Sequence, residues 1–137
     1  MRGIRTIPAL PVRDTDTAVA FYRDRLGFAV AHQHTGFARM VRDAAEVHLW
    51  ESGDEEWRDR DGLPDRPVQS GAESFIAGTA SCRIEVDDVD AGYAEMSEAG
   101  VLHYADPGGP TDTDFGTREF AISDLDNNLI VFFQAQE

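Results

Sequence analysis

One pattern occurs twice in the chain, and it limits the possible folds more than any other feature. In each copy a short apolar run leads into an aspartate-rich turn, which a helical pattern and then a glycine follow. The spacing from the valine before the turn to the glycine is 15 residues in the first copy and 14 in the second. We therefore expect two equivalent supersecondary units. The two copies begin Val12-Arg-Asp14-Thr-Asp16 and Val86-Asp-Asp88-Val-Asp90, and their glycines are Gly27 and Gly100.

The residues after the first turn predict a helix. Asp14 or Thr15 is a candidate N-cap, and Gly27 is a candidate C-terminal stop. Steps of three and four between apolar residues indicate one apolar helix face. The residues on this face are Ala18, Val19, Phe21, Tyr22 and Leu26.

Three strand-like runs follow each helix. In the first half they cover 28–32, 37–42 and 47–51. The second half opens with a strand over 80–86 and a helix over 90–98, and its three strands cover 101–104, 118–123 and 129–134. The segment Asp124-Leu-Asp126-Asn127-Asn128 predicts a hairpin turn, since Asn tolerates positive φ. We predict an α+β fold in which two βαβββ modules form a cupped mixed sheet with the helices on its outer face.

The length predicts one domain over residues 1–137, with half-modules at about 1–75 and 76–137. Two long loops, 53–78 and 106–116, interrupt the repeated plan. Loops of more than about 12 to 15 residues without secondary structure are usually functional or disordered. Because both loops join parts of a sheet, we expect them to cover a cleft.

The net charge of −14 argues against nucleic acid as a partner, since such proteins need a basic face. The acidity keeps the protein soluble or, alternatively, attracts a cationic ligand. No signal peptide is visible, and no apolar run approaches the length of about 18 residues that a membrane span needs. We expect a cytoplasmic protein without a membrane partner. Cys82 is the one cysteine, and we interpret it as a small buried apolar residue.

Alternation along the strands predicts which side chains share a face. We expect Cys82, Ile84 and Val86 to face the helices. The opposite, cleft-facing set is Ser81, Arg83 and Glu85. By the same rule His48 and Trp50 share one face, and so do Phe37, Arg39 and Val41.

Two sets of residues resemble the vicinal oxygen chelate superfamily (glyoxalase, bleomycin resistance protein and dioxygenase), and the resemblance covers nearly the whole chain. They are Val12-x-Asp14…Phe21-Tyr22…Leu26-Gly27-Phe28 and Ile122-x-Asp124-x-Asp126-x-Asn128-Leu129-Ile130. Within the superfamily the chain is most similar to the bleomycin-resistance, drug-binding proteins. The segments that carry this similarity are Asp24-Arg-Leu-Gly-Phe28, Gly36-Phe-Ala-x-x-Val-Arg-Asp43 and Gly116-x-Arg-Glu-Phe-Ala-x-x-Asp124.

The enzymes of this superfamily hold a divalent metal ion on the cupped face, with His, Glu or Gln ligands. The resemblance places Ile7, His48, Ser81 and Val131 at the ligand positions. Only His48 is a good ligand, whereas a metal ion needs about three or four converging donors. We therefore expect no metal, no other cofactor and no catalytic residue.

The resemblance to the drug-binding members implies a homodimer whose clefts are made by both subunits. It also implies that the first strand is exchanged between subunits at a proline, and Pro8 or Pro11 fits such a hinge. The alternative is that these prolines mark an edge strand.

Aromatic rings that stack on a flat ligand are the expected binding groups. We interpret Trp57 as a pocket residue, while Phe37 and Trp50 suit a pocket or the packing of the core or dimer equally well. Arg83 on the cleft face repels a cationic tail unless Glu85 or another acid pairs with it, and it suits an anionic or carbonyl-rich ligand. An unpaired Arg83 therefore argues against bleomycin itself. The predicted ligand-binding residues are Phe37, His48, Trp50, Trp57, Phe75, Arg83 and Phe115.

Three functions compete. The favoured one is non-catalytic sequestration of a small antibiotic-like molecule, of the bleomycin type or another planar natural product, giving resistance. The second is a metal-dependent enzyme like the glyoxalases or dioxygenases. The third is a cofactor-free enzyme with His48 as a base, for which the sequence offers no partner.

Overall fold

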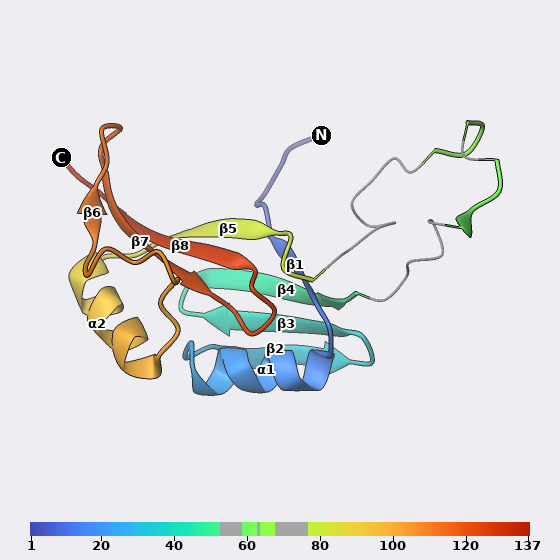
Figure 1. Ribbon diagram of the computed structural model, residues 1–137, viewed down its shortest axis with the longest axis horizontal. Helices are drawn as coiled ribbons and strands as arrows, with labels where there is room; N and C mark the ends of the chain where they lie inside the picture. Colours follow the sequence, from blue (N-terminus) through green and yellow to red (C-terminus); the bar gives the residue numbers. More distant parts are fainter. Residues whose placement is uncertain (53–58, 63, 68–76) are drawn as a thin grey trace.

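The computed structural model describes residues 1–52, 59–62, 64–67 and 77–137, and it contains two four-stranded mixed sheets and two helices (Figure 1). The first sheet has the order β1-β4-β3-β2, with β1 Ala9–Val12, β2 Ala29–His34, β3 Phe37–Arg42 and β4 Ala45–Glu51. The second has the order β5-β8-β7-β6, with β5 Ser81–Glu85, β6 Thr111–Asp112, β7 Thr117–Ser123 and β8 Leu129–Ala135. Helix α1 covers Thr15–Asp24 and α2 covers Val89–Ala99.

The repeat read from the sequence is present in the topology. In each half the opening strand pairs in parallel with the last strand, and the remaining pairs are antiparallel. Asp14 and Asp88 are the equivalent N-caps, because their carboxylates accept hydrogen bonds from the backbone N–H of Thr17 and Ala91 at 2.9 and 3.0 Å. The α+β prediction with two βαβββ modules is confirmed, although they form two sheets and not one continuous sheet.

One predicted strand was wrong. Residues 101–104 do not form a strand, and only an isolated bridge joins Leu102 to Ile122. The edge of the second sheet is the two-residue β6, which lies inside the predicted 106–116 loop. Val101 is buried and Leu102 packs against the core, which explains these two apolar residues, whereas Tyr104 is exposed. An apolar run of four residues does not distinguish a strand from a buried loop.

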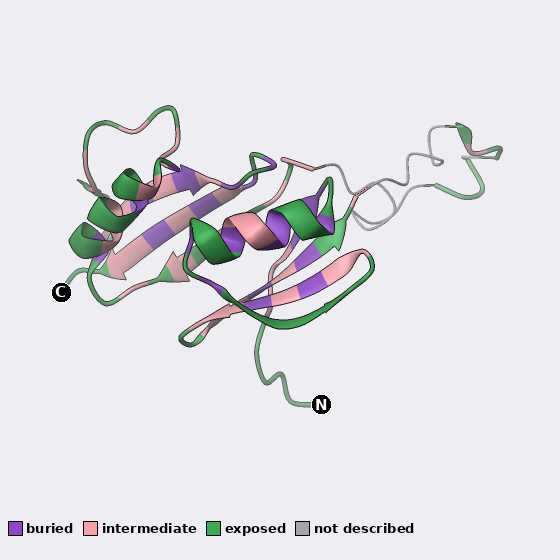
Figure 2. Cartoon of the chain, turned by 90° about the horizontal axis from the view of Figure 1, so that it is seen from below, coloured by how far each residue is buried: buried purple, intermediate pink, exposed green. Residues whose placement is uncertain are grey.

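Both helices lie on the same side of the sheets, below them in Figure 1, and Figure 2 shows them in front of the strands. The core fills the space between helices and sheets, with Tyr22, Leu26, Met40, Met96 and residues that alternate along the strands. Along β5, Cys82 and Ile84 pack against this core while Ser81, Arg83 and Glu85 are exposed. The opposite face of each sheet is therefore left open, as the alternation predicted.

The hairpin turn between β7 and β8 also joins the two modules. Asn127 has a φ of 69°, in agreement with the predicted turn. The side-chain amide of Asn128, which is fully buried, donates to the Pro11 carbonyl at 2.8 Å. The Asp126 carboxylate accepts from the backbone N–H and guanidinium of Arg13 at 2.9 and 3.0 Å. The boundary proposed near residue 75 lies outside the described residues, so the single domain and its half-modules stay predictions.

The first strand pairs with β4 of the same chain, in the register Ala9 to His48. Pro8 precedes this strand and Pro11 is buried within it. A single chain does not test strand exchange, so the hinge and the edge-strand interpretations of these prolines both stay open.

Candidate functional site

The open face of the first sheet carries a cluster of aromatic rings centred on Phe37. The β3–β4 register places Phe37 opposite Trp50 and Arg39 opposite His48. The Phe37 ring lies 5.2 Å from the Trp50 ring and 5.1 Å from the His48 ring, both edge-on, and it stacks on the His34 ring at 5.2 Å. We define the aromatic cluster as His32, His34, Phe37, His48 and Trp50.

These rings lie at the surface of the described chain and not in its core. Trp50 is 44% exposed, and Phe37 is half-buried. Neither residue belongs to the core between helices and sheets. Phe37 and Trp50 therefore do not pack in the core, and the two other interpretations, a ligand pocket or a dimer contact, stay open.

His48 has a hydrogen-bond partner that the sequence did not suggest. Its Nε2 lies 2.8 Å from Oε2 of Glu46, two residues earlier on the same strand face. The other oxygen of Glu46 receives Arg39 at 3.2 Å and Arg5 at 3.5 Å. Hydrogen bonds from Arg39 and His48 hold the pKa of the Glu46 carboxyl below its ordinary value. Because a carboxylate only accepts, His48 donates to Glu46 through Nε2.

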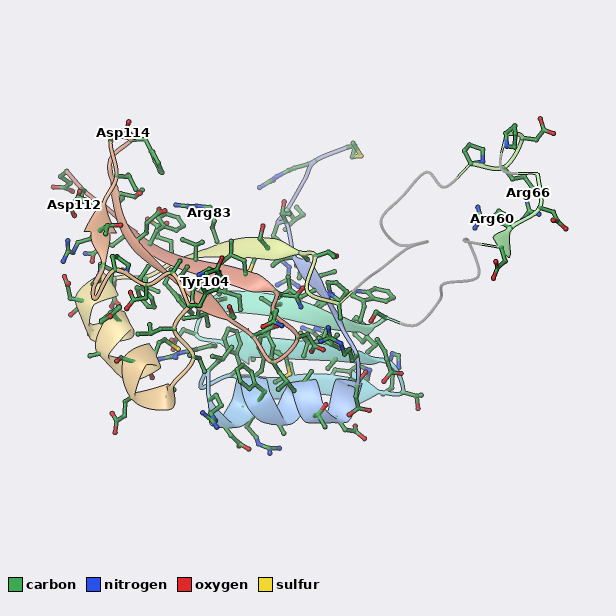
Figure 3. The ribbon with its side chains drawn as sticks, viewed as in Figure 1. Arg60, Arg66, Arg83, Tyr104, Asp112 and Asp114 are labelled. Atoms are coloured by element: carbon green, nitrogen blue, oxygen red, sulfur yellow. The ribbon has the colours of Figure 1, made fainter. Side chains whose placement is uncertain are left out.

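The open face of the second sheet carries Arg83, which Figure 3 labels on β5. Its guanidinium donates to Glu119 on β7 at 2.7 Å and lies 4.7 Å from the centre of the Phe133 ring on β8. The hydrogen bond from Arg83 lowers the pKa of the Glu119 carboxyl. Arg83 is thus paired with an acid, and that acid is Glu119 and not Glu85.

Phe115 lies in the turn between β6 and β7 and is 66% exposed. This turn is at the opposite end of the molecule from the end of β4 that carries Trp50 (Figure 1). Among the described residues no ring contact joins Phe115 to the aromatic cluster, so one chain does not bring them together. The other two predicted residues, Trp57 and Phe75, lie outside the described residues.

The loop before β6 covers a small hollow on the second sheet. The hollow has a volume of about 200 Å³, and its walls come from the loop and from β7 and β8. It is lined by His103, Ala105, Asp106, Pro107, Gly109, Thr111, Glu119, Phe120, Ala121 and Val131. The 106–116 loop therefore does cover a hollow, as expected for a functional loop, but one too small for a drug-sized molecule.

The residues at the superfamily's metal positions do not fit a metal ion. Ile7 and Val131 have hydrocarbon side chains without donor atoms, and Val131 pairs with Arg83 across the strands. Within the part of the chain that the structure describes, no group of three or more His, Cys, Asp or Glu is placed to hold a metal ion. No chemistry on a bound metal follows from this residue set.

Sequence reasoning missed five residues of the two open faces: His32, His34, Glu46, Glu119 and Phe133. The signal was available for Glu46, which is two residues before His48 and so shares its face by alternation. Glu119 and Phe133 were not predictable in this way, because their contact with Arg83 depends on how three strands are placed side by side.

Cys82 is a free thiol that packs against the core. Burial raises the pKa of this thiol from 9.0 to about 11, and Asp124 contributes to the rise. A thiol in such an environment is a poor nucleophile. Among the described helices, none is long and apolar enough to cross a membrane.

The fold has two βαβββ modules, with the helices on one side of the sheets and an open face with aromatic rings on the other. This arrangement belongs to a known class of protein. The model of the Glyoxalase/Bleomycin resistance protein/Dioxygenase superfamily matches residues 6–132, and the chain belongs to this superfamily. A bleomycin resistance protein of Geobacillus stearothermophilus is 48% identical over 132 residues, which cover 96% of each chain.

Solved structures give the same fold. A bleomycin-binding protein from bleomycin-producing Streptomyces verticillus, in complex with copper(II)-bleomycin, matches with a TM-score of 0.70 and 27% identity. The match covers 100% of this chain and 99% of that chain. A bleomycin resistance determinant encoded on the transposon Tn5 has a TM-score of 0.71 at 22% identity, covering 98% of this chain and 100% of that chain, and supports the fold alone.

Proposed function

We propose that the protein binds a bleomycin-type antibiotic without chemical change and confers resistance by sequestering it. The observation that carries the proposal is the exposed aromatic cluster around Phe37, since stacked rings are suited to a flat heteroaromatic ligand. The similarity to bleomycin resistance proteins over 96% of the chain supports the same assignment.

The pairing of Arg83 removes the main objection to bleomycin. A free guanidinium on the open face repels the cationic tail of such a molecule. Glu119 neutralises Arg83 at 2.7 Å, and the Phe133 ring covers one side of the guanidinium. The second sheet then presents no unpaired guanidinium at Arg83, so this residue no longer opposes a cationic ligand.

We propose further that the binding cleft is completed by a second copy of the chain. Phe115 and Arg83 lie on the second module, whereas Phe37, His48 and Trp50 lie on the first. A homodimer that faces the first sheet of one chain toward the second sheet of its partner unites these residues. Trp57 and Phe75 stay predictions for the same cleft, and the cytoplasm stays the expected compartment.

The test is a titration of the purified protein with copper(II)-bleomycin, in which binding is measured by calorimetry and by tryptophan fluorescence. Light scattering gives the mass of the protein before and after the ligand is added. We expect saturable binding with one ligand for each chain of a dimer. Absence of binding in both measurements contradicts the proposed ligand, and a monomer that binds with full stoichiometry contradicts the shared cleft.

A cofactor-free enzyme is the second candidate, because Glu46 gives His48 the polar partner that proton transfer needs. Recovery of unchanged antibiotic after prolonged incubation supports sequestration, and modified antibiotic supports the enzyme. Elemental analysis of the purified protein tests the expectation that no metal is bound, and a stoichiometric metal that His48→Ala removes contradicts it.

A further inference from the structure

A second hollow lies on the helix side of the sheets, where the two modules meet. It has a volume of about 600 Å³ and is bounded by the β3–β4 turn, the end of β5 and the start of α2. The turn and α2 lie at the same end of the molecule (Figure 1). Phe120 and Phe132 line the hollow and belong to the core, whereas their strand neighbours Glu119 and Phe133 contact Arg83 on the open face. The hollow is therefore separate from the aromatic cluster and from the site proposed above.

The floor of this hollow is apolar. Phe28, Met96 and Phe120 line it and are 3%, 1% and 5% exposed. Its walls are kept open by small residues, since Ala44, Ala91 and Gly92 also line it. A volume of about 600 Å³ is within the range of about 300 to 1,000 Å³ that is typical of small-molecule sites.

The rim is acidic. Four acidic residues and one arginine line the rim: Asp43, Asp87, Asp88, Glu95 and Arg42. Glu85 also borders the hollow, but it alternates with Ile84 along β5 and shares the open face with Arg83. The guanidinium is already satisfied, because Arg42 donates to the Leu26 carbonyl at 2.9 Å and pairs with Glu95 at 2.9 Å.

Two of the remaining carboxylates are free for a ligand. Asp88 caps α2. Within the described part of the chain, no hydrogen bond or ion pair engages the side chain of Asp43 or Asp87, and both residues are exposed. The rim thus attracts positive charge and repels negative charge.

We propose that this hollow binds an amphiphilic organic cation, with its apolar body on the Phe28–Met96–Phe120 floor and its charged group at Asp43 and Asp87. An apolar body gains free energy by leaving water for this floor. A cationic head at the rim keeps its hydration and gains attraction to the free carboxylates. A bare metal ion is not the ligand, because the side chains of the floor offer no oxygen or nitrogen donor and the described residues hold no group of three or more His, Cys, Asp or Glu placed to bind one.

The probe is naphthylmethyltrimethylammonium, and its matched control is naphthylmethanesulfonate, which has the same apolar body and the opposite charge. Binding is followed by amide chemical-shift changes in the intact protein. We expect the cation to shift the amides of 43–45, 84–88 and 91–96, and we expect the anion to bind at least about tenfold more weakly. Equal affinity for the two probes, or shifts confined to β3 and β4, overturns the proposal.

Two matched pairs of variants locate the site. Ala91→Trp fills the hollow, whereas Ala94→Trp places the same side chain at an exposed position of α2 that does not line it. Asp43→Asn with Asp87→Asn removes the two free carboxylates, and Asp114→Asn removes an exposed carboxylate in the β6–β7 turn. We expect the first member of each pair to weaken binding of the cation by about threefold or more and its control to leave binding unchanged.

Phe37→Ala separates this site from the proposed antibiotic cleft. We expect it to leave the binding of the naphthyl cation unchanged while it weakens binding of copper(II)-bleomycin. If Phe37→Ala abolishes cation binding and Ala91→Trp does not, the cation binds at the aromatic cluster and the second site is refuted.

Discussion

The hydroxyl of Tyr22 donates a hydrogen bond of 2.8 Å to the Asp124 carboxylate, and this contact joins the two modules across a separation of 102 residues in the chain. Tyr22 is fully buried and Asp124 is 4% exposed. Asp124 also accepts from the backbone N–H of Asp126 and Asn128, so one carboxylate fixes the hairpin turn and docks it on α1. Burial raises the pKa of Tyr22 well above its ordinary value, which keeps the hydroxyl a donor.

Tyr22→Phe is expected to destabilise the protein by about 1 to 3 kcal/mol, because a buried carboxylate oxygen loses a donor. Tyr93→Phe is a matched control, since the Tyr93 hydroxyl donates to Asp106 at 2.7 Å within one module and is less buried. Tyr93→Phe is expected to lower the free energy of unfolding by less than about 1 kcal/mol. Urea unfolding measures both, and equal losses contradict the assigned role of the contact between modules.

Asp124 is also expected to make the stability depend on pH. Burial raises the pKa of this carboxyl above its ordinary value of 3.8 in the folded state. Between the unfolded and the folded pKa of Asp124, the folded protein binds more protons than the unfolded chain. The contribution of Asp124 to the free energy of unfolding is therefore present at low pH and is lost as the pH rises through the folded pKa. The free energy of unfolding of the wild type relative to Asp124→Asn should fall as the pH is raised from below 3.8 through the folded-state pKa of Asp124.

Glu119→Gln provides the control of opposite sign. Arg83 lowers the pKa of Glu119 below its ordinary value of 4.5. The contribution of Glu119 to the free energy of unfolding is present above pH 4.5 and is lost as the pH falls. The free energy of unfolding of the wild type should therefore rise relative to that of Glu119→Gln as the pH rises. The same trend in both comparisons contradicts at least one of the two assigned pKa directions.

Phe37→Ala is expected to weaken the binding of copper(II)-bleomycin by about tenfold or more, because the central ring of the aromatic cluster is lost. Calorimetry measures the change. Leu125→Ala serves as the control, since Leu125 is 48% exposed but lies in the turn between β7 and β8. Equal effects of the two substitutions argue against ligand stacking on the cluster.

Glu119→Gln is further expected to weaken bleomycin binding by about two- to fivefold, because it leaves the Arg83 charge without its partner on the open face. The double variant Arg83→Met with Glu119→Gln removes that charge and should restore most of the affinity. The loss should also shrink in high salt. If the double variant loses as much affinity for bleomycin as the two single variants together, Glu119 does not neutralise Arg83.

Cys82 is expected to react slowly with iodoacetamide. Its pKa of about 11 leaves little thiolate near pH 8, so alkylation should be at least about tenfold slower than in the urea-unfolded chain at the same pH. Mass spectrometry of the alkylated protein gives both rates. Rapid alkylation of the folded protein contradicts the packed position of the thiol.

The sequence by itself determined the repeated βαβββ plan, the start of the first helix at Asp14 or Thr15, and the faces of β4 and β5. These features depend on periodicity and on local turn chemistry, which neighbouring residues set. The hydrocarbon side chains of Ile7 and Val131 also indicated, without any structure, that the superfamily's metal positions are unsuited to a metal ion here.

Only the tertiary structure decided which distant residues meet. The pairing of Arg83 with Glu119, the contact of Tyr22 with Asp124 and the hollow over Phe28, Met96 and Phe120 all join segments far apart in the chain. Periodicity gives the face on which a side chain lies, but not the strand or helix that is packed beside it. The strand predicted over 101–104 was wrong for the same reason, because burial by the rest of the fold makes a loop apolar as readily as pairing in a sheet does.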